Sequence, residues 1–157
     1  MAEDMKLKNA QSVYKTLCDT LDARKWRYDK HPEDLIVRFE VVGEDLPMEF
    51  IAKIDVEREL IRLVSFLPFK FSEAKRVEGA IATSQANFRL CDGSFDYNIL
   101  DGKVNFRMTS SFRDSLISQE LFAYMIDCAC DTVDDFNDKF LMLDKGVLEL
   151  EEFFKKN

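Results

Sequence analysis

The sequence has few of the residues on which metal sites, disulfide scaffolds and nucleophilic catalysis depend. Its single histidine, His31, stands beside Pro32 in a predicted turn and needs no function there. Its four cysteines include no C-x-x-C pair, and Cys128 and Cys130 would point about 200° apart on a helix. We therefore expect reduced cysteines and a cytoplasmic protein.

Long apolar runs and nucleotide-binding motifs are also absent. No stretch approaches about eighteen apolar residues, and the first ten residues contain no apolar h-region, so neither a membrane span nor a signal peptide is expected. The five glycines are scattered, without G-x-x-x-x-G-K or G-x-G-x-x-G spacing, and no G-x-S-x-G occurs. The sequence thus predicts no catalytic residue, no cofactor and no metal ligand.

Positive charge is scarce. The formal net charge is −8 at pH 7, and an acidic domain repels phosphate backbones unless a basic patch overrides the mean. The densest basic group is Arg24-Lys25 with Arg27 and Lys30 nearby. Nucleic-acid binding is therefore not expected.

Hydrophobic residues, in contrast, are plentiful enough for one packed domain. They make up 46% of the chain, and fourteen phenylalanines against one tryptophan indicate an aromatic-rich core. A length of 157 residues suits one domain without stabilising cross-links.

Hydrophobic periodicity predicts that this domain spans residues 1–157. Trp26 and Tyr28 could begin a short strand. The predicted elements are a helix over 4–24, a three-strand meander over 35–67, a helix over 72–90, a hairpin over 94–110, a long helix over 118–145 and an amphipathic tail over 147–156. This order predicts an α+β fold, in which helices pack on one face of an antiparallel β-sheet of about five strands.

Local signals predict how several of these elements begin or end. Pro68 cannot donate to a ladder, so it helps to end the third strand of the meander. Ser72 is a suitable N-cap for the next helix, and Ser118 for the long helix. Asp101-Gly102 predicts a type I′ turn in the hairpin.

The stretch LVSFLPFKFSEAKR, residues 63–76, joins the meander to the second helix. We expect its aromatic rings to form core packing where that helix folds back on the sheet, rather than a binding site. The rings are Phe66, Phe69 and Phe71, and the helix that follows carries a stripe at helical spacing formed by Ala74, Val77, Ile81, Ser84 and Phe88.

An acidic face on the long helix is the sharpest charged feature. Its aspartates fall at spacings of three and four and are Asp127, Asp131, Asp134, Asp135 and Asp138. A solvated helix face is the simplest interpretation, and a surface for a basic partner is the functional one. Paired helical carboxylates also hold Mg²⁺ or Mn²⁺, but such sites need a facing acidic helix, and none is predicted.

The tail VLELEEFFKK has a short apolar face that something must cover, because about ten residues do not hold a helix alone in water. This face consists of Val147, Leu148, Leu150, Phe153 and Phe154. It packs either on its own domain or on a second subunit or a client.

Three stretches together resemble the bacterial YbjN-like family. They are FIAKIDVERELIRLVSFLPFKFSEAKR, the hairpin GSFDYNILDGKVNFRMTSSF and the helix beginning SQELFAYMIDCACDTVDDF, and the match covers roughly residues 10–143. Members are labelled sensory transduction regulators, and the family is similar in fold to type III secretion chaperones. The resemblance implies a cytosolic, non-enzymatic protein that binds other proteins. Secretion chaperones commonly dimerise and bind extended client segments.

We therefore predict a non-enzymatic bacterial protein-binding module, chaperone- or adaptor-like and homodimeric, with an unidentified protein partner or client. An exposed sheet edge, the mixed sheet face or the tail would bind an extended segment. The residues predicted to bind protein are Leu148, Leu150, Phe153, Phe154, Asp131 and Asp135. Two alternatives stay open: a metal-dependent enzyme that uses the acidic helix face, and a regulator that senses a small ligand.

Overall fold

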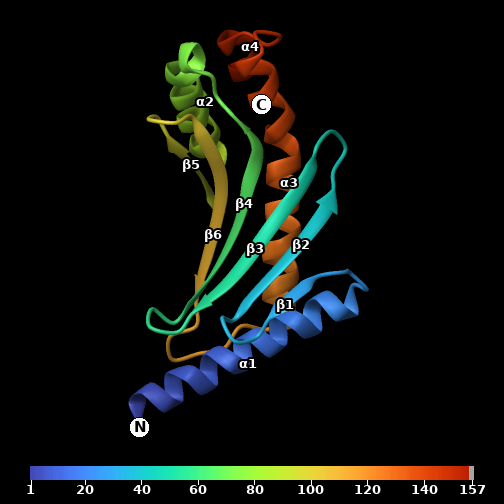
Figure 1. Cartoon of the computed structure of the whole chain (residues 1–157), viewed down its shortest axis with the longest axis vertical. Coiled ribbons are helices and arrows are strands. Elements are labelled where there is room, and N and C mark those ends of the chain that lie inside the picture. Colours follow the sequence, from blue (N-terminus) through green and yellow to red (C-terminus); the bar gives the residue numbers. More distant parts are fainter. Residues whose placement is uncertain (156–157) are drawn as a thin grey trace.

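The computed structural model describes residues 1–155 of the chain. Its elements, drawn in Figure 1, are α1 (Ala2–Ala23), β1 (Asp29–His31), β2 (Ile36–Val42), β3 (Pro47–Asp55), β4 (Leu60–Lys70), a 3₁₀ turn (Glu73–Lys75), α2 (Arg76–Arg89), β5 (Ser94–Asn98), β6 (Lys103–Ser111), α3 (Gln119–Asp144) and α4 (Leu150–Lys155). Residues 156 and 157 lie outside the described part. The predicted tail (147–156) ends at the first of them, and the predicted domain (1–157) ends at the second.

Six strands form one antiparallel sheet in the order β1-β2-β3-β4-β6-β5. The predicted α+β fold with an antiparallel sheet is thus confirmed, with one strand more than the five expected. The additional strand is β1, whose three residues follow Trp26 and Tyr28. Because these three residues are polar, they show no apolar alternation that would reveal a strand.

The register of the sheet collects apolar side chains on one face. One buried row across five strands consists of Phe39, Phe50, Ser65, Phe106 and Phe95, each paired with the next. Helices α1 and α3 pack on this face, with α3 running the length of the sheet in Figure 1. The opposite face is only partly covered, and its neighbouring row is Arg38, Ile51, Val64 and Arg107.

Two polar contacts fix the long helices. Ser118 caps α3 as predicted, because its hydroxyl accepts a hydrogen bond from the Leu121 amide at 3.1 Å. The Tyr14 hydroxyl of α1 donates to the carbonyl of Ile36 at 2.9 Å, and burial raises the pKa of Tyr14 to about 12, so this donor stays protonated. None of the helices in the described residues is long and apolar enough to cross a membrane.

Strand β4 does not end at Pro68. It continues to Lys70, and its register with β6 shifts between Phe66 and Lys70. A bulge of this kind leaves the extra residues out of the ladder, so a proline without an N–H is tolerated inside the strand. The expectation that Pro68 helps to end the strand is therefore wrong.

The three rings of the stretch 63–76 do not form one core cluster. Phe71 is fully buried, and Phe69 packs beside it with ring centroids 6.1 Å apart. Phe66 is more than half exposed on the open face of the sheet. Alternation along β4 explains the difference, because Phe66 lies next to the inward-facing Ser65 and must point to the opposite face.

The large apolar residues of helix α2 predict that their side of the helix faces the core, but in the structure the opposite side does. Its buried residues are the small ones, Gly79, Ala82, Thr83 and Ala86, while Val77, Ile81, Ser84 and Phe88 of the predicted stripe are exposed. A Cβ at Gly79 would come within 2.8 Å of the Phe71 ring, so α2 approaches the core too closely for larger side chains.

Ser72 is the N-cap residue of the 3₁₀ turn with which this helical segment begins, whereas the N-cap of α2 itself is Lys75. The side chain of Ser72 makes no capping hydrogen bond. Instead its backbone amide donates to the Asp144 carboxylate of α3 at 2.7 Å. The segment before α2 is thus attached to α3, and a 3₁₀ turn precedes the helix.

The hairpin between β5 and β6 has a loop of residues 99–102 rather than a two-residue type I′ turn. Only Gly102 in this loop has a positive φ, +78°, whereas a type I′ turn requires two such residues. The Phe71 amide donates to the Gly102 carbonyl at 2.8 Å, so this loop is held against the end of β4. Such close approach is possible because Gly102 has no side chain.

The C-terminal tail packs on its own domain. Phe153 of α4 is fully buried and stacks on Phe140 of α3, with ring centroids 5.6 Å apart. Leu148 is buried as well, and the Arg89 guanidinium of α2 donates to the carbonyl of Phe154 at 2.8 Å. Of the two alternatives for the tail, the structure has the intramolecular one.

We predict that Gly102→Ala destabilises the fold more than Gly146→Ala does. Both glycines have a positive φ, +78° and +73°, so each substitution carries backbone strain of roughly 1–2 kcal/mol. Only at Gly102 would the new Cβ clash with a backbone atom, the carbonyl oxygen of Phe71, which adds about 1–3 kcal/mol. Urea unfolding of both variants measures the difference, and equal losses would contradict the close contact.

We predict that Phe153→Ala lowers the free energy of unfolding by about 3–5 kcal/mol, because it removes a fully buried ring. The matched control is Val147→Ala in the same tail, where the side chain is exposed and the change stays within about 0.5 kcal/mol. Thermal and urea unfolding provide the measurement. If the Phe153 variant kept wild-type stability, the intramolecular docking of α4 would be refuted.

Candidate functional site

The two edges of the sheet differ in whether their backbone is available. At the β5 edge, the side-chain amide of Asn87 from α2 makes two hydrogen bonds to the backbone of Phe95. Its amide nitrogen donates to the Phe95 carbonyl at 3.0 Å, and its amide oxygen accepts from the Phe95 amide at 2.7 Å. Asn87 therefore occupies both outward backbone groups of Phe95, the second residue of this edge strand.

The outer edge of β2 is open beyond its contact with β1. The pairing of β1 covers only residues 36–38 of β2. On the other side of β2, the Ile54 amide donates to the Leu35 carbonyl at 3.0 Å. Since backbone direction alternates along an antiparallel strand, the N–H and C=O groups of Glu40 and Val42 point outward. No strand of the described chain pairs with them there.

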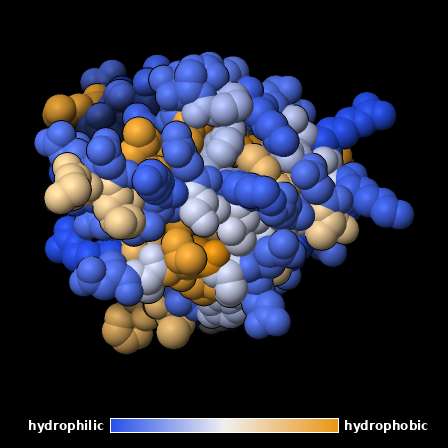
Figure 2. Space-filling model, turned by 90° about the horizontal axis from the view of Figure 1, so that it is seen from below, coloured by the Kyte–Doolittle hydropathy of each residue, from blue (hydrophilic) through white to orange (hydrophobic). Residues whose placement is uncertain are grey.

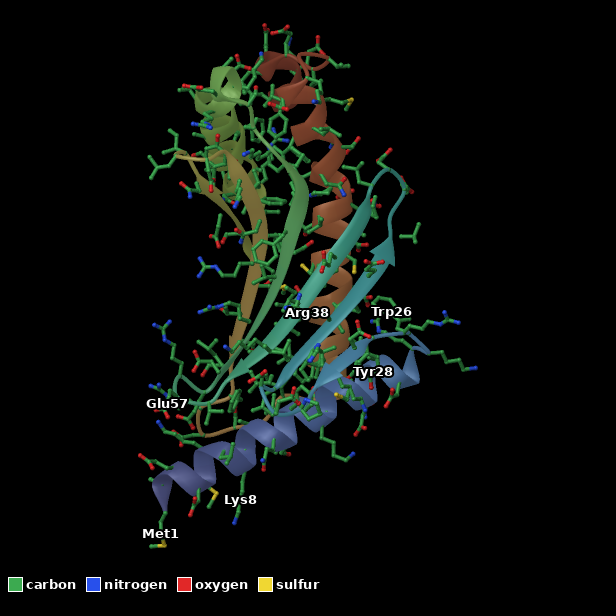
Figure 3. All side chains as sticks on the ribbon, viewed as in Figure 1. Met1, Lys8, Trp26, Tyr28, Arg38 and Glu57 are labelled. Atoms are coloured by element: carbon green, nitrogen blue, oxygen red, sulfur yellow. The ribbon has the colours of Figure 1, made fainter. Side chains whose placement is uncertain are left out.

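Two hollows flank this open edge, between β2 and residues 26–28, which precede β1 and do not pair with β2. This region is here called the wedge. The larger has a volume of about 410 Å³ and is lined by Arg27, Tyr28, Arg38, Glu40, Val42 and Glu49, among others. The smaller, of about 260 Å³, is lined by Trp26, Arg27, Glu40, Val41 and Val42. Figure 3 labels Trp26, Tyr28 and Arg38 in this region, between the C-terminal end of α1 and the sheet.

Aromatic contacts hold the wall of the wedge in place. The Trp26 ring packs on Phe39 at 5.8 Å, and the Arg24 guanidinium lies 5.1 Å from the centre of the Trp26 ring. The Tyr28 hydroxyl donates to the Asp22 carboxylate at 2.7 Å, and burial together with this bond raises the pKa of Tyr28. These contacts hold Trp26 and Tyr28 in place beside β2.

A second surface is the exposed face of α2, formed by Val77, Ile81, Ser84 and Phe88. Val77 is 66%, Ile81 43% and Phe88 85% exposed. The end of the molecule formed by α1 offers less, because Figure 2 shows its hydrophobic residues in separate groups among hydrophilic ones. The α2 face is thus an apolar strip along a helix that is fixed by its other side.

The aspartates on the acidic face of α3 have different surroundings. Asp127 pairs with Arg24 at 2.8 Å, and Asp134 accepts from the Glu44 amide at 3.0 Å. Burial, and then the nearby Asp45, raises the pKa of Asp138. In the part of the chain that the structure describes, no group of three or more His, Cys, Asp or Glu side chains could hold a metal ion.

The residues predicted to bind protein are not brought together. Asp131 and Asp135 are exposed, while Leu150 and Phe154 are partly buried against the core. Leu148 and Phe153 are buried in it, so the side chains of these two offer no surface to a partner. Protein binding by the exposed members stays a prediction.

The cysteine thiols do not form a reactive centre. All four are free. Burial raises the pKa of Cys130 to about 12 and also raises those of Cys18 and Cys128. A thiol is nucleophilic as its thiolate, so these three are poor nucleophiles at neutral pH.

Sequence reasoning missed the open edge of β2 and the hydrogen bonds of Asn87 to the backbone of β5. No local pattern distinguishes Asn87 from any other exposed polar residue of a helix. Arg27 and Trp26, in contrast, were visible in the sequence, Arg27 in the densest basic group and Trp26 as a possible start of a short strand. The stripe on α2 was visible too, but the sequence does not show which side of the helix faces the core.

Three solved structures share this fold. The chain matches the "Structure of the HopA1-SchA Chaperone-Effector Complex" with a TM-score of 0.57 and 10% identity, over 84% of this chain and 97% of that one. It matches the "Crystal Structure of the ExsC-ExsE Complex" with a TM-score of 0.58 and 14% identity, over 81% and 92%. YbjN from E. coli, titled "a putative transcription regulator", matches with a TM-score of 0.57 and 12% identity, over 80% and 92%.

No curated protein matches the chain. The family model YbjN, described as "Putative bacterial sensory transduction regulator", matches residues 14–142. These residues include every strand of the sheet and nearly all of α3. The resemblance drawn from the sequence is thereby confirmed, and the chain belongs to the YbjN family.

Proposed function

We propose that this chain is a cytoplasmic, non-enzymatic protein-binding module, chaperone- or adaptor-like, that works as a homodimer. It captures an extended segment of another protein, here called the client, on the outer edge of β2. The client segment adds to the sheet as a strand and continues the line of β1. Backbone hydrogen bonds provide the attachment, and side chains at alternate positions enter the flanking hollows.

One observation carries this proposal: the outward backbone groups of Glu40 and Val42 are unpaired beside two hollows. Exposed edges are usually blocked in proteins, because they pair with other chains. At the opposite edge, Asn87 occupies the outward backbone groups of Phe95. An open edge with hollows beside it is what a strand-capturing protein needs.

The structural neighbours support a protein-binding role. One is titled a chaperone-effector complex and another a complex of two proteins, and both share the fold over most of this chain. The acidic face of α3 does not favour the metal-dependent alternative, because Asp127 and Asp134 are already engaged within the domain.

We predict that Glu40→Pro weakens client binding at least about tenfold, whereas Glu40→Ala leaves it within about twofold. Proline removes the outward N–H and places its ring at the edge, while alanine removes only the side chain. The loss of one hydrogen bond is worth about 0.5–1.5 kcal/mol, and obstruction by the ring adds to it. Affinity capture from host lysate with mass spectrometry identifies the client, and calorimetry with its purified segment measures both variants.

The two variants share a control for folding. Because the N–H of Glu40 makes no bond to β3, both variants should unfold at concentrations of urea close to that of the wild type. Wild-type affinity of the Glu40→Pro variant would exclude strand addition at this edge. Failure of the wild type to capture any protein from its host would refute the proposed function itself.

A further inference from the structure

An apolar hollow lies beside the bulge of β4. Between Phe66 and Lys70, where the register shifts, β4 has three residues and β6 has one. Bulges of this kind bend a strand and are frequent next to active sites. The hollow has a volume of about 570 Å³, and residues 66–70 of β4 line it together with Lys103 and Val104 of β6. Small-molecule sites typically have volumes of about 300–1,000 Å³.

The walls of this hollow are apolar and partly fixed by the core. Leu67 is buried, and Phe69 packs beside the buried Phe71 with ring centroids 6.1 Å apart. Phe66 and Pro68 alternate with them and are exposed. The hollow thus combines a rigid base with apolar surface that faces solvent.

Neighbouring elements leave the hollow accessible. In the described chain, β3 pairs with β4 only as far as Ser65, and the two strands diverge beyond that point in Figure 1. Helices α1 and α3 pack on the opposite face of the sheet. A small molecule could therefore enter without any rearrangement of the fold.

A pair of lysines stands at one end of the hollow. Lys70 is the last residue of β4 and Lys103 the first of β6, and they are paired directly opposite each other. The Cβ atoms of such a pair are roughly 4.5–5.5 Å apart, and like charges in this position are destabilising. Both side chains are exposed, so an anion can reach them.

The charge of the lysine pair is only partly balanced within the chain. Among the described residues, only Asp101 pairs with either lysine, at 3.8 Å from the Nζ of Lys103. The backbone amide of Lys103 also donates to the Asp101 carboxylate at 2.9 Å, which holds that carboxylate in place. Two ammonium groups and one carboxylate leave one positive charge, which matches a ligand with a single negative charge.

We propose that this hollow binds a small monocarboxylate with an apolar body, the chemistry of a medium-chain fatty acid. The ligand carboxylate accepts charge-assisted hydrogen bonds from Lys70 and Lys103, and its apolar body lies on Phe66 and Pro68. The inference does not rest on client capture, because β3 lies between β2 and β4 in the sheet.

The test is an NMR titration of the isotope-labelled protein with octanoate. Backbone amide shifts should concentrate at residues 66–70 and 103–104 and give a dissociation constant below about 1 mM. Octanol has the same body without the charge and should bind at least about tenfold more weakly. Acetate has the charge without the body and should not saturate the site at about 10 mM.

Variants with matched controls separate the head of the site from its body. Lys70→Glu should weaken octanoate binding at least about tenfold, whereas Lys53→Glu, at an exposed lysine of β3, should leave it within about twofold. Phe66→Ser should also weaken it about tenfold, whereas Phe88→Ser, at the exposed phenylalanine of α2, should not. Melting temperatures should stay close to that of the wild type, since all four side chains are exposed.

Three results would overturn the proposed site. They are amide shifts spread over the other apolar surfaces, octanol binding as tight as that of octanoate, and wild-type octanoate affinity of the Lys70→Glu variant. The first would show adsorption without a site, and the other two would show that the lysine pair does not hold the carboxylate.

Client capture is measured separately on the same variants. Glu40→Pro should leave octanoate binding within about twofold, because its effect is confined to the edge of β2. Lys70→Glu should leave client capture unchanged. If Lys70→Glu released the client, the hollow would belong to the client and the small-molecule site would be wrong. If the wild type bound octanoate but captured no protein, the hollow would stand and the proposed function would fail.

Discussion

A single register across the sheet is the constraint on which the rest of the structure depends. The row from Phe39 through Phe50 and Phe106 to Phe95 is apolar because every strand is in phase with its neighbours. A slip of one residue in any pair would turn that strand's apolar side chains to solvent. The same register directs the backbone of Glu40 away from the sheet. Core packing and the open edge are therefore consequences of one alignment.

The close packing of α2 against the core also has two consequences. Gly79 and the other small residues bring the helix against Phe71 and Tyr97, so large apolar side chains can lie only on its outer face. The same approach places Asn87 within bonding distance of Phe95. One packing arrangement thus occupies the outward backbone groups of Phe95 at the edge of the sheet and leaves an apolar surface on the outer side of α2.

The structural features that depend on local periodicity could be predicted from the sequence. Alternation in β3 and β4 and the cap at Ser118 were recognisable, and so were the antiparallel sheet and its helical cover. The orientation of α2 was not, because a stripe of large residues such as Phe88 normally marks the buried side, and only the folded core shows that Gly79 must face it. The open edge at Glu40 could not be predicted either, since it depends on where β1 stops pairing in space.

The shortness of the open edge would give the proposed homodimer a physical role. Beyond the end of β1, only Glu40 and Val42 direct backbone groups outward, and each hydrogen bond contributes about 0.5–1.5 kcal/mol net. One edge alone would therefore hold an extended segment weakly. A homodimer would present two such edges, and binding of a second segment of the same client would become intramolecular, which would raise its effective concentration. Self-association and capture at the open edge would in this way reinforce each other.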